Sequence, residues 1–160
     1  MRNALKFSVK WALAKTPFRL IRAPLNRFQA IEECLRHLKG LGYAPRIVVD
    51  GGAHLGDFSA LAEVIFPGAA IHMIEPQPAC QDALAAFARK RGFKLHSVAL
   101  VSEEEAGKPV TMAAGSEPST GVYIVPPSDR VPGNVLVDTS TLDRLFGSTA
   151  SPWGSNSAQT

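Results

Sequence analysis

Two short apolar runs, each ending in an acid, constrain the fold of this chain more than any other feature. Residues 47–49 lead directly into Asp50, and residues 69–74 lead directly into Glu75. Short runs of this kind are typical of strands that are buried on both faces of a parallel sheet. A glycine-rich stretch, residues 51–56, follows the first acid at once. We therefore expect both acids at the carboxyl ends of neighbouring strands, where open α/β sheets bind ligands.

Helical patterns alternate with the apolar runs, which indicates βαβ units and a parallel sheet. Pro67-Gly68 and Gly92 mark the ends of two of the helices. The expected elements are a helix over 25–38, strands over 46–49, 69–74 and 94–100, and helices from about residue 56 to 65 and from about residue 76 to 91. The predicted fold class is α/β, with a Rossmann-like, open and mostly parallel sheet flanked by helices.

The pattern changes after Ser102. Short strands, antiparallel or at an edge, are expected over 110–112 and 122–125, another apolar run covers 134–137, and a short helix is expected over 139–146. Three parts follow from this reading. They are a basic amphipathic arm over 1–24, a domain over 25–146, and a polar tail over 147–160 whose composition predicts disorder.

The excess positive charge of the chain lies at its N-terminal end, in the arm and the few residues after it. The net charge is +3, but residues 1–30 hold seven of the 17 basic side chains and no acid, which leaves 10 basic and 14 acidic residues elsewhere. The domain therefore gives no reason to expect nucleic-acid binding. The arm lacks the continuous apolar segment of a secretory signal or a spanning helix. We interpret it as a segment that caps the domain. Peripheral membrane contact through residues 1–22, a targeting role and disorder remain open.

The two cysteines indicate neither a metal site nor a redox motif. Cys34 and Cys80 have no ligand or redox spacing, which predicts buried or half-buried thiols in a reducing compartment. We expect a cytoplasmic protein, with or without membrane contact through the arm, and no metal.

The glycine stretch favours one nucleoside cofactor over another. A dinucleotide site has Gly-x-Gly-x-x-Gly, and Ala53 stands where that pattern needs its second glycine. Gly52 and Gly56 let the backbone approach a ligand closely. Asp50 is a poor neighbour for a pyrophosphate but suits a ligand with a cationic amino group, while Glu75 suits ribose hydroxyls in either cofactor class. The pattern therefore favours S-adenosylmethionine.

Several segments resemble the FkbM-type methyltransferases, a branch of the S-adenosylmethionine-dependent class I fold. The segments that carry the resemblance are 49–59, 74–78 and 98–100, with weaker matches at 119–122 and 141–145. The first two are fairly specific in combination, and the resemblance covers about residue 45 to 146. It implies transfer of a methyl group from a sulfonium to a hydroxyl oxygen of a sugar or natural product.

The resemblance also assigns roles to residues. Asp50, Gly52 and Gly56 would shape the methionine end of the pocket, and Glu75 would bind the ribose. Ala99 and Leu100 would lie against the adenine. The full set of expected cofactor-binding residues is Asp50, Gly51, Gly52, Ala53, His54, Gly56, Glu75, Pro76, Ala99 and Leu100. No catalytic base is assigned. His72 is expected to be a packed or edge histidine rather than a base.

The chain departs from the family after the 141–145 segment. The family continues there into a further core strand, whereas this chain runs into Gly147 and the polar tail. The expected fold is therefore an incomplete class I methyltransferase fold, with an exposed sheet edge. Two alternatives remain open. One is a non-catalytic remnant or interaction module that keeps the cofactor-binding half, and the other is an NAD-dependent oxidoreductase or epimerase.

Overall fold

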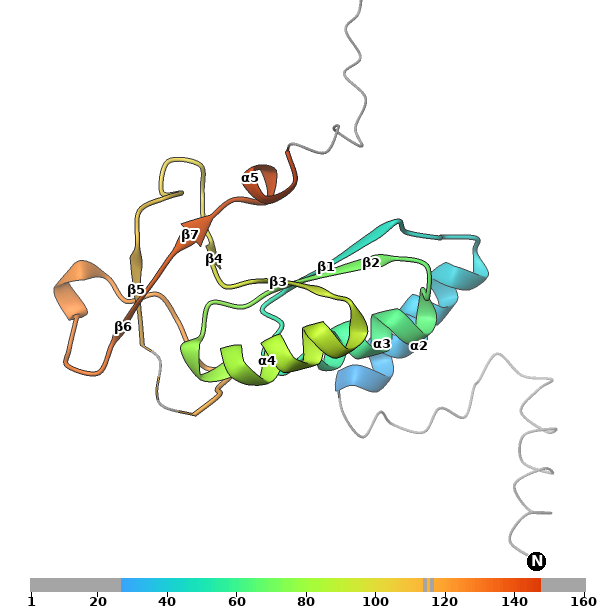
Figure 1. Cartoon of the computed structure of the whole chain (residues 1–160), viewed down its shortest axis with the longest axis horizontal. Helices are drawn as coiled ribbons and strands as arrows, with labels where there is room; N and C mark the ends of the chain where they lie inside the picture. The colour runs from blue at the N-terminus through green and yellow to red at the C-terminus, as the bar shows by residue number, and fades with distance from the viewer. Residues whose placement is uncertain (1–26, 114, 116, 148–160) are drawn as a thin grey trace, which may run out of the picture. The chain divides into compact units, whose positions relative to one another are not determined.

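The structure is a computed structural model that describes residues 27–113, 115 and 117–147 (Figure 1). The predicted arm over 1–24 and all but Gly147 of the predicted tail lie outside these residues. The chain divides into two compact units, residues 1–34 and 35–160. Helix α2, Arg27–Gly40, crosses from the first unit into the second. The other elements described below belong to the second unit.

A parallel three-stranded sheet forms the first part of the second unit. Its strands are β1 (Ile47–Gly51), β2 (Ala70–Ile74) and β3 (Lys94–His96), and their order is β1-β2-β3. Val48 lies beside Ile71, and Met73 lies beside Leu95. The strands expected over 46–49 and 69–74 are confirmed, with shifts of one or two residues at their ends.

Helices α3 (Asp57–Ile65) and α4 (Pro78–Arg91) connect the three strands. Both helices lie on the same side of the sheet (Figure 1). The sequence signals hold at both ends of α4, because Pro78 occupies its first turn and Gly92 ends it with a left-handed φ of 74°. The two helices were predicted close to these bounds.

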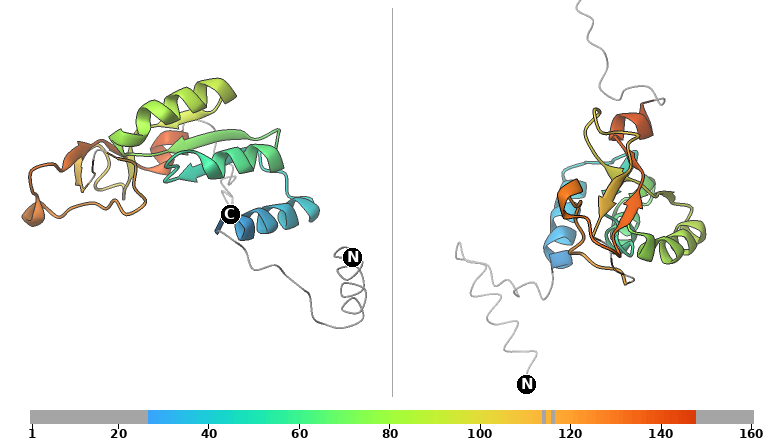
Figure 2. Two further views of the ribbon diagram at one scale, coloured as in Figure 1. Left: turned by 90° about the horizontal axis from the view of Figure 1, so that it is seen from below. Right: turned by 90° about the vertical axis from the view of Figure 1, so that its left-hand side faces the viewer.

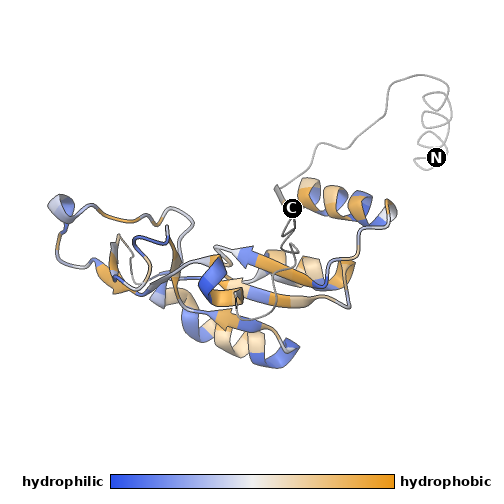
Figure 3. Ribbon diagram, turned by 90° about the horizontal axis from the view of Figure 1, so that it is seen from above, coloured by the Kyte–Doolittle hydropathy of each residue, from blue (hydrophilic) through white to orange (hydrophobic). Residues whose placement is uncertain are grey.

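The main core lies between the sheet and these two helices. Alternate residues of β2, Ile71 and Met73, point to this side and are 3% and 0% exposed. They pack with Leu84 and Ala88 of α4 and with Ala62 of α3. Figure 3 shows largely apolar strands and helices in which apolar and polar residues alternate. Apolar burial against α3 and α4 thus stabilises the parallel sheet and positions the carboxyl ends of β1 and β2.

The chain after β3 forms two small sheets at one end of the three-stranded sheet (Figures 1 and 2). Parallel strands β4 (Ala99–Leu100) and β7 (Thr139–Ser140) make one. Antiparallel strands β5 (Val110–Met112) and β6 (Val135–Val137) make the other. A short 3-10 helix, η1 (Pro127–Asp129), lies in the connection between β5 and β6.

Three expectations for this region need correction. The strand expected over 94–100 is split, because β3 pairs with β2 whereas β4 pairs with β7. Residues 122–125 form only a single bridge, from Ile124 to Met112. The helix expected over 139–146 is β7 followed by α5 (Leu142–Phe146). The side chain of Thr141 accepts a hydrogen bond from the Arg144 N–H and so begins the helix three residues later than expected.

The described residues therefore show a mixed α/β structure with small parallel sheets and four α-helices. Cys80 is buried as expected, but Cys34 is exposed on α2, which corrects the expectation of a buried or half-buried thiol. Among the described residues, no helix has the length and apolar content needed to cross a membrane.

Candidate functional site

The turn after β1 is bound to the end of β2 through its backbone. The N–H groups of Gly52 and Ala53 donate to the carbonyl oxygen of Ile74 at 2.8 and 3.1 Å, and the Gly56 N–H donates to the Ala53 carbonyl at 2.7 Å. Gly52 and Gly56 have φ angles of 80° and 86°, in the left-handed region that glycine tolerates best. The glycines thus let the chain reverse sharply between β1 and α3.

The Glu75 carboxylate binds this turn from the tip of β2. One oxygen, Oε2, accepts the His54 N–H at 2.8 Å, and the other, Oε1, accepts the Gln77 N–H at 2.9 Å. Glu75 is only 2% exposed. A buried carboxylate is stabilised by hydrogen bonds of this kind, and each of its oxygens has a second lone pair for a ligand hydroxyl.

The Asp50 carboxylate lies at the beginning of helix α3. Its Oδ2 accepts a hydrogen bond from the Ser59 hydroxyl at 2.7 Å, and Asp50 is 6% exposed. Burial raises the pKa of Asp50 above its usual value, the hydrogen bonds from Ser59 oppose this rise, and the Glu75 charge adds to it. Two acids are therefore held together at the carboxyl ends of β1 and β2, as the sequence predicts.

The backbone N–H groups of the turn are already used within the protein. Those of Gly52, Ala53, His54 and Gly56 donate to protein oxygens. A phosphate site at a helix start needs such groups free, together with a positive dipole end that no other anion occupies. Here Asp50 takes up that place at the start of α3. The turn is therefore poorly suited to a pyrophosphate.

His54 has two unusual features. Its φ is 51°, which makes it the sole non-glycine residue with a positive φ in the described part of the chain. Its Nε2 atom is buried without a hydrogen-bond partner. Histidine is several-fold enriched among the non-glycine residues that adopt a left-handed backbone. The turn itself therefore accounts for the backbone angle. The orphaned nitrogen is an unused polar group of the residue whose backbone N–H binds Glu75.

Gly56 has a packing role as well as a conformational one. A Cβ atom at this position would lie 2.8 Å from Cε1 of Phe87 on α4. The close approach of the turn to α4 therefore requires glycine, whatever binds nearby. Sequence reasoning assigned Gly56 to the cofactor pocket, and the structure gives it a place in the helix packing too.

The side chains of the two adenine-side residues, which are neighbours in β4, have different surroundings. Leu100 is 39% exposed, and its Cδ1 atom would be 3.8 Å from a Cβ atom on Gly51. Ala99 is 5% exposed and packs instead with Met112 and Val137 in the core of the small sheets. Pro76 is half-buried between Glu75 and Gln77. Of the two adenine-side candidates, only Leu100 is thus placed beside the glycine turn.

Sequence reasoning missed three residues that support the two acids. Ser59 binds Asp50, and its signal is its position in the first turn of the helix that follows the acid. Gln77 is 6% exposed, and its side-chain oxygen accepts the Ser119 N–H at 3.1 Å, which ties a distant loop to the tip of β2. Gln81 donates to the Glu75 carbonyl at 2.6 Å.

A histidine pair lies on the face of the three-stranded sheet that is turned away from the core with α3 and α4. The rings of His72 and His96 stack with centroids 5.3 Å apart, and their Nδ1 and Nε2 atoms are 3.1 Å apart. Phe146 of α5 contacts both rings. Burial, with the neighbouring positive charge of Lys94, lowers the pKa of each histidine. His72 is 7% exposed, so its prediction as a packed histidine is confirmed.

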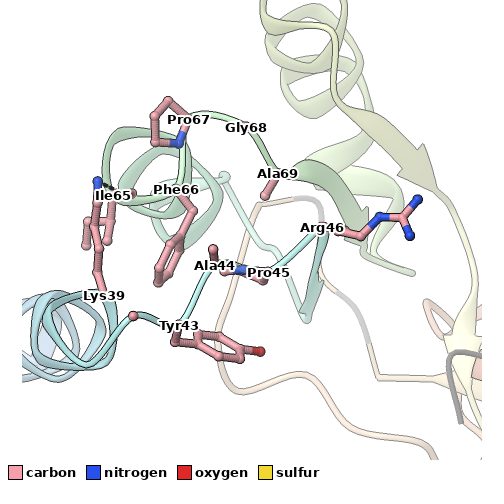
Figure 4. A pocket seen from close by; sticks show the side chains of 11 residues that line it. Lys39, Tyr43, Ala44, Pro45, Arg46, Ile65, Phe66, Pro67, Gly68 and Ala69 are labelled. Atoms are coloured by element: carbon pink, nitrogen blue, oxygen red, sulfur yellow. Dashed lines mark hydrogen bonds between the residues drawn. The ribbon is translucent and has the colours of Figure 1, made fainter.

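A cavity of about 500 Å³ lies at the other ends of the strands, away from the two acids (Figure 4). It is bounded by the end of α2 and by residues 42–46 and 65–69. The Lys39 ammonium group, one of its polar groups, already donates to the Ile65 carbonyl. This cavity has no contact with the carboxylates and does not extend the site.

No group of three or more metal-ligating side chains is present among the described residues. Comparisons with protein-family models, with curated proteins and with solved structures gave no match to this chain.

Proposed function

We propose that the chain binds S-adenosylmethionine at the carboxyl ends of β1 and β2 and acts as a methyltransferase, or as the cofactor-binding part of one. The acceptor would be a hydroxyl group of a small molecule or glycan, as the resemblance to FkbM-type methyltransferases implies. The three-stranded parallel sheet would then be one half of a Rossmann-like class I fold.

The observation that carries this proposal is the pairing of two buried carboxylates with a turn that has little left to offer a phosphate. Asp50 and Glu75 make the carboxyl ends of β1 and β2 acidic, and four N–H groups of the turn donate to protein oxygens. S-adenosylmethionine has an ammonium group, a sulfonium and ribose hydroxyls, and no phosphate. This chemistry fits two acids, whereas a dinucleotide would place its pyrophosphate against Asp50.

Each residue of the site would bind a different part of the cofactor. Glu75 would accept the ribose hydroxyls with its remaining lone pairs, and Asp50 would attract the ammonium group. Leu100 would cover the adenine beside Gly51. When bound, the cofactor supplies an activated methyl group, and the protein contributes chiefly by aligning donor and acceptor. No base is assigned, although His54, a residue of the turn, has a buried Nε2 atom without a hydrogen-bond partner.

A second candidate is a non-catalytic interaction module. The observation that favours it is the open side of the sheet, because β1 is an edge strand among the described residues and Ile47 and Val49 are 46% and 38% exposed. A module of this kind would bind the cofactor, or a partner, without transferring the methyl group.

Calorimetric titration of the full chain with S-adenosylmethionine, and separately with NAD, tests the proposal. We expect saturable heat with the first ligand and none with the second. Asp50→Asn should weaken binding about 10- to 100-fold, the equivalent of roughly 1.5–3 kcal/mol for a hydrogen bond to a charged group. The matched control is Glu63→Gln, which removes an acid from the exposed face of α3.

The Asp50 variant should keep its fold, which separates loss of binding from loss of structure. The pKa of Asp50 is raised in the folded protein, so its ionised form costs stability at neutral pH, and the neutral Asn relieves that cost. Thermal melting at pH 7 should therefore give a midpoint equal to or above that of the wild type. Heat with NAD and none with S-adenosylmethionine, from a well-folded protein, would overturn the proposal.

A further inference from the structure

We propose that Gln77 is a positioning residue of the candidate site and that residues 117–121, which it holds at the tip of β2, border the ribose end of the bound cofactor. This role rests on the proposed function, because it requires that Glu75 binds the ribose hydroxyls. It adds a distant segment of the chain to the site and names the side chain that keeps this segment in place.

Gln77 contacts both the Glu75 carboxylate and a segment far along the chain. Its backbone N–H donates to Glu75 Oε1 at 2.9 Å, and its side-chain oxygen accepts the Ser119 N–H at 3.1 Å. Gln77 is 6% exposed, and a buried amide oxygen is costly unless it accepts a hydrogen bond. The contact with Ser119 therefore fixes the side chain as well as the segment. A single residue thus connects the carboxylate expected to bind ribose with Ser119.

The Gln77 side chain does not cap the helix that begins beside it. Gln77 is the N-cap residue of α4, a position whose side chain commonly accepts a hydrogen bond from the first turn of the helix. Here the side chain makes no such bond, and Pro78 occupies the first turn. Its oxygen instead binds Ser119, 42 residues further along the chain. Formation of α4 therefore does not account for this contact.

The backbone on both sides of the Gln77 amide is also restrained. Gln81 Nε2 donates to the Glu75 carbonyl at 2.6 Å and to the Gln77 carbonyl at 3.2 Å. Gln81 Oε1 in turn accepts the hydroxyl of Ser97, just after β3. These bonds hold Glu75 and Gln77 against α4 and the end of β3. A ligand that binds the Glu75 carboxylate would therefore restrain Gln77 and, through it, the distant segment.

Residues 117–121 form the tip of a loop whose base belongs to the small sheets. The base is closed by a hydrogen bond of 3.0 Å from the Ala113 N–H to the Tyr123 carbonyl. Ser119, at the tip, is exposed, so burial of its side chain does not hold it in place. The hydrogen bond to Gln77 holds it at the carboxyl end of β2, the end at which open sheets bind ligands.

The link between Glu75 and Ser119 should act in both directions. If a ligand hydroxyl at Glu75 stabilises the Ser119 contact, the Ser119 contact must strengthen binding of that ligand by the same factor. The nucleoside part of S-adenosylmethionine has the ribose hydroxyls, whereas its amino-acid part is expected at Asp50. The response of Ser119 should therefore follow the nucleoside and not the amino acid.

Amide hydrogen exchange, followed by NMR on the full chain, tests this role. Saturating S-adenosylmethionine or adenosine should slow exchange at the Ser119 N–H by about 5-fold or more, which is the lower end of usual couplings between sites, and methionine should leave it unchanged. Gln77→Met keeps the backbone N–H and the side-chain length but removes the acceptor. In this variant Ser119 should exchange faster and no longer respond to adenosine, and the affinity for adenosine should fall by the factor that the response has lost.

Two further variants separate positioning from general support of the fold. Ser119→Pro removes the N–H donor at an exposed position. Its loss of adenosine affinity should not add to that of Gln77→Met in the double variant, because both changes remove the same hydrogen bond. The matched control is Thr139→Val, which removes hydrogen bonds of β7 but not the one to Gln77. This control should keep the adenosine response at Ser119.

The outcomes separate this role from the proposed function. Saturable binding of S-adenosylmethionine without a response at Ser119, or with an unchanged response in Gln77→Met, overturns the role of Gln77 and leaves the proposed function standing. Additive losses in the double variant also overturn it. A well-folded chain that binds neither S-adenosylmethionine nor adenosine overturns both proposals.

Discussion

The second unit has two regions, and different interactions stabilise the interior of each. In the parallel-sheet region, residues 47–96, large apolar side chains such as Met73 and Leu84 are 0% exposed between sheet and helices. In the small-sheet region, residues 97–147, the apolar core consists of Ala99, Met112 and Val137 with a few partly buried valines.

In the small-sheet region, hydrogen bonds from polar side chains take the place of large buried apolar side chains. The Thr139 hydroxyl bonds with the backbone at Glu105, Gly107 and Lys108. Arg144 joins Glu103 to the Ala106 carbonyl. Because the acids Asp50 and Glu75 belong to the parallel-sheet region, the candidate site is held by the part with the larger core. We therefore expect truncation of a core side chain to destabilise the parallel-sheet region most. Loss of a side-chain hydrogen bond should destabilise the small-sheet region most.

The largest effect is expected from Leu84→Ala. The side chain is fully buried on α4 against the sheet, and its truncation leaves a cavity, so unfolding free energy should fall by about 2–5 kcal/mol. Chemical denaturation measures this loss. The control is Leu136→Ala on β6, where the side chain is 67% exposed and the change should stay within about 0.5 kcal/mol. Equal losses at the two positions would contradict the difference between the regions.

Gly56→Ala should have the next largest effect. The new Cβ meets Phe87 at 2.8 Å and forces a side chain into φ of 86°, so the loss combines overlap with backbone strain, about 2–4 kcal/mol together. Gly92→Ala isolates the strain, because Gly92 has φ of 74° and open space around its Cβ position. It should cost about 1 kcal/mol. The difference between the denaturant midpoints of the two variants gives the cost of the overlap with Phe87 beyond that of backbone strain. Equal midpoints would mean that Gly56 makes no close packing contact.

Thr139→Val tests the polar support of the small-sheet region. Valine keeps the shape but leaves the Gly107 N–H and nearby carbonyl groups without the hydroxyl, so the loss should be about 1–2 kcal/mol. Thr120→Val, at an exposed position, is the control. Hydrogen exchange should show faster opening of β4 and β7 and little change in β2. A uniform loss across both regions would show that they unfold as one unit.

The difference between the regions also explains what the sequence could predict. The parallel-sheet region follows strong local signals, such as Pro78 and Gly92 at the ends of α4, so β1, α3, β2, α4 and both acids were placed correctly, and only the end of its third strand was not. The small-sheet region depends on long-range hydrogen bonds, which no local pattern encodes. The split of the strand expected over 94–100 follows from the pairing of β4 with β7, a segment 40 residues further along the chain. The His72–His96 contact likewise depends on register.

The smallest expected effect concerns the contact between the two regions, where Phe146 covers His72 and His96. The pKa of each histidine is lowered in the folded protein, so the unfolded chain binds protons more tightly. The stability that the neutral pair contributes is present above the unfolded value of about 6.5 and falls as the pH drops below it. The positive charge of Lys94 lowers the pKa of both histidines and so acts in the same direction.

Melting temperatures recorded between pH 7.5 and 5.5 should therefore decline for the wild type. In His96→Gln, only His72 remains to titrate at this contact, so the decline should be shallower. The ring NMR signals of His72 and Phe146 would shift together as α5 loosens. If the variant shows the same slope as the wild type, the histidine pair does not link the small-sheet region to the parallel sheet. The hydrogen bond from the Ser119 N–H to the Gln77 side chain then remains as a link between the two regions.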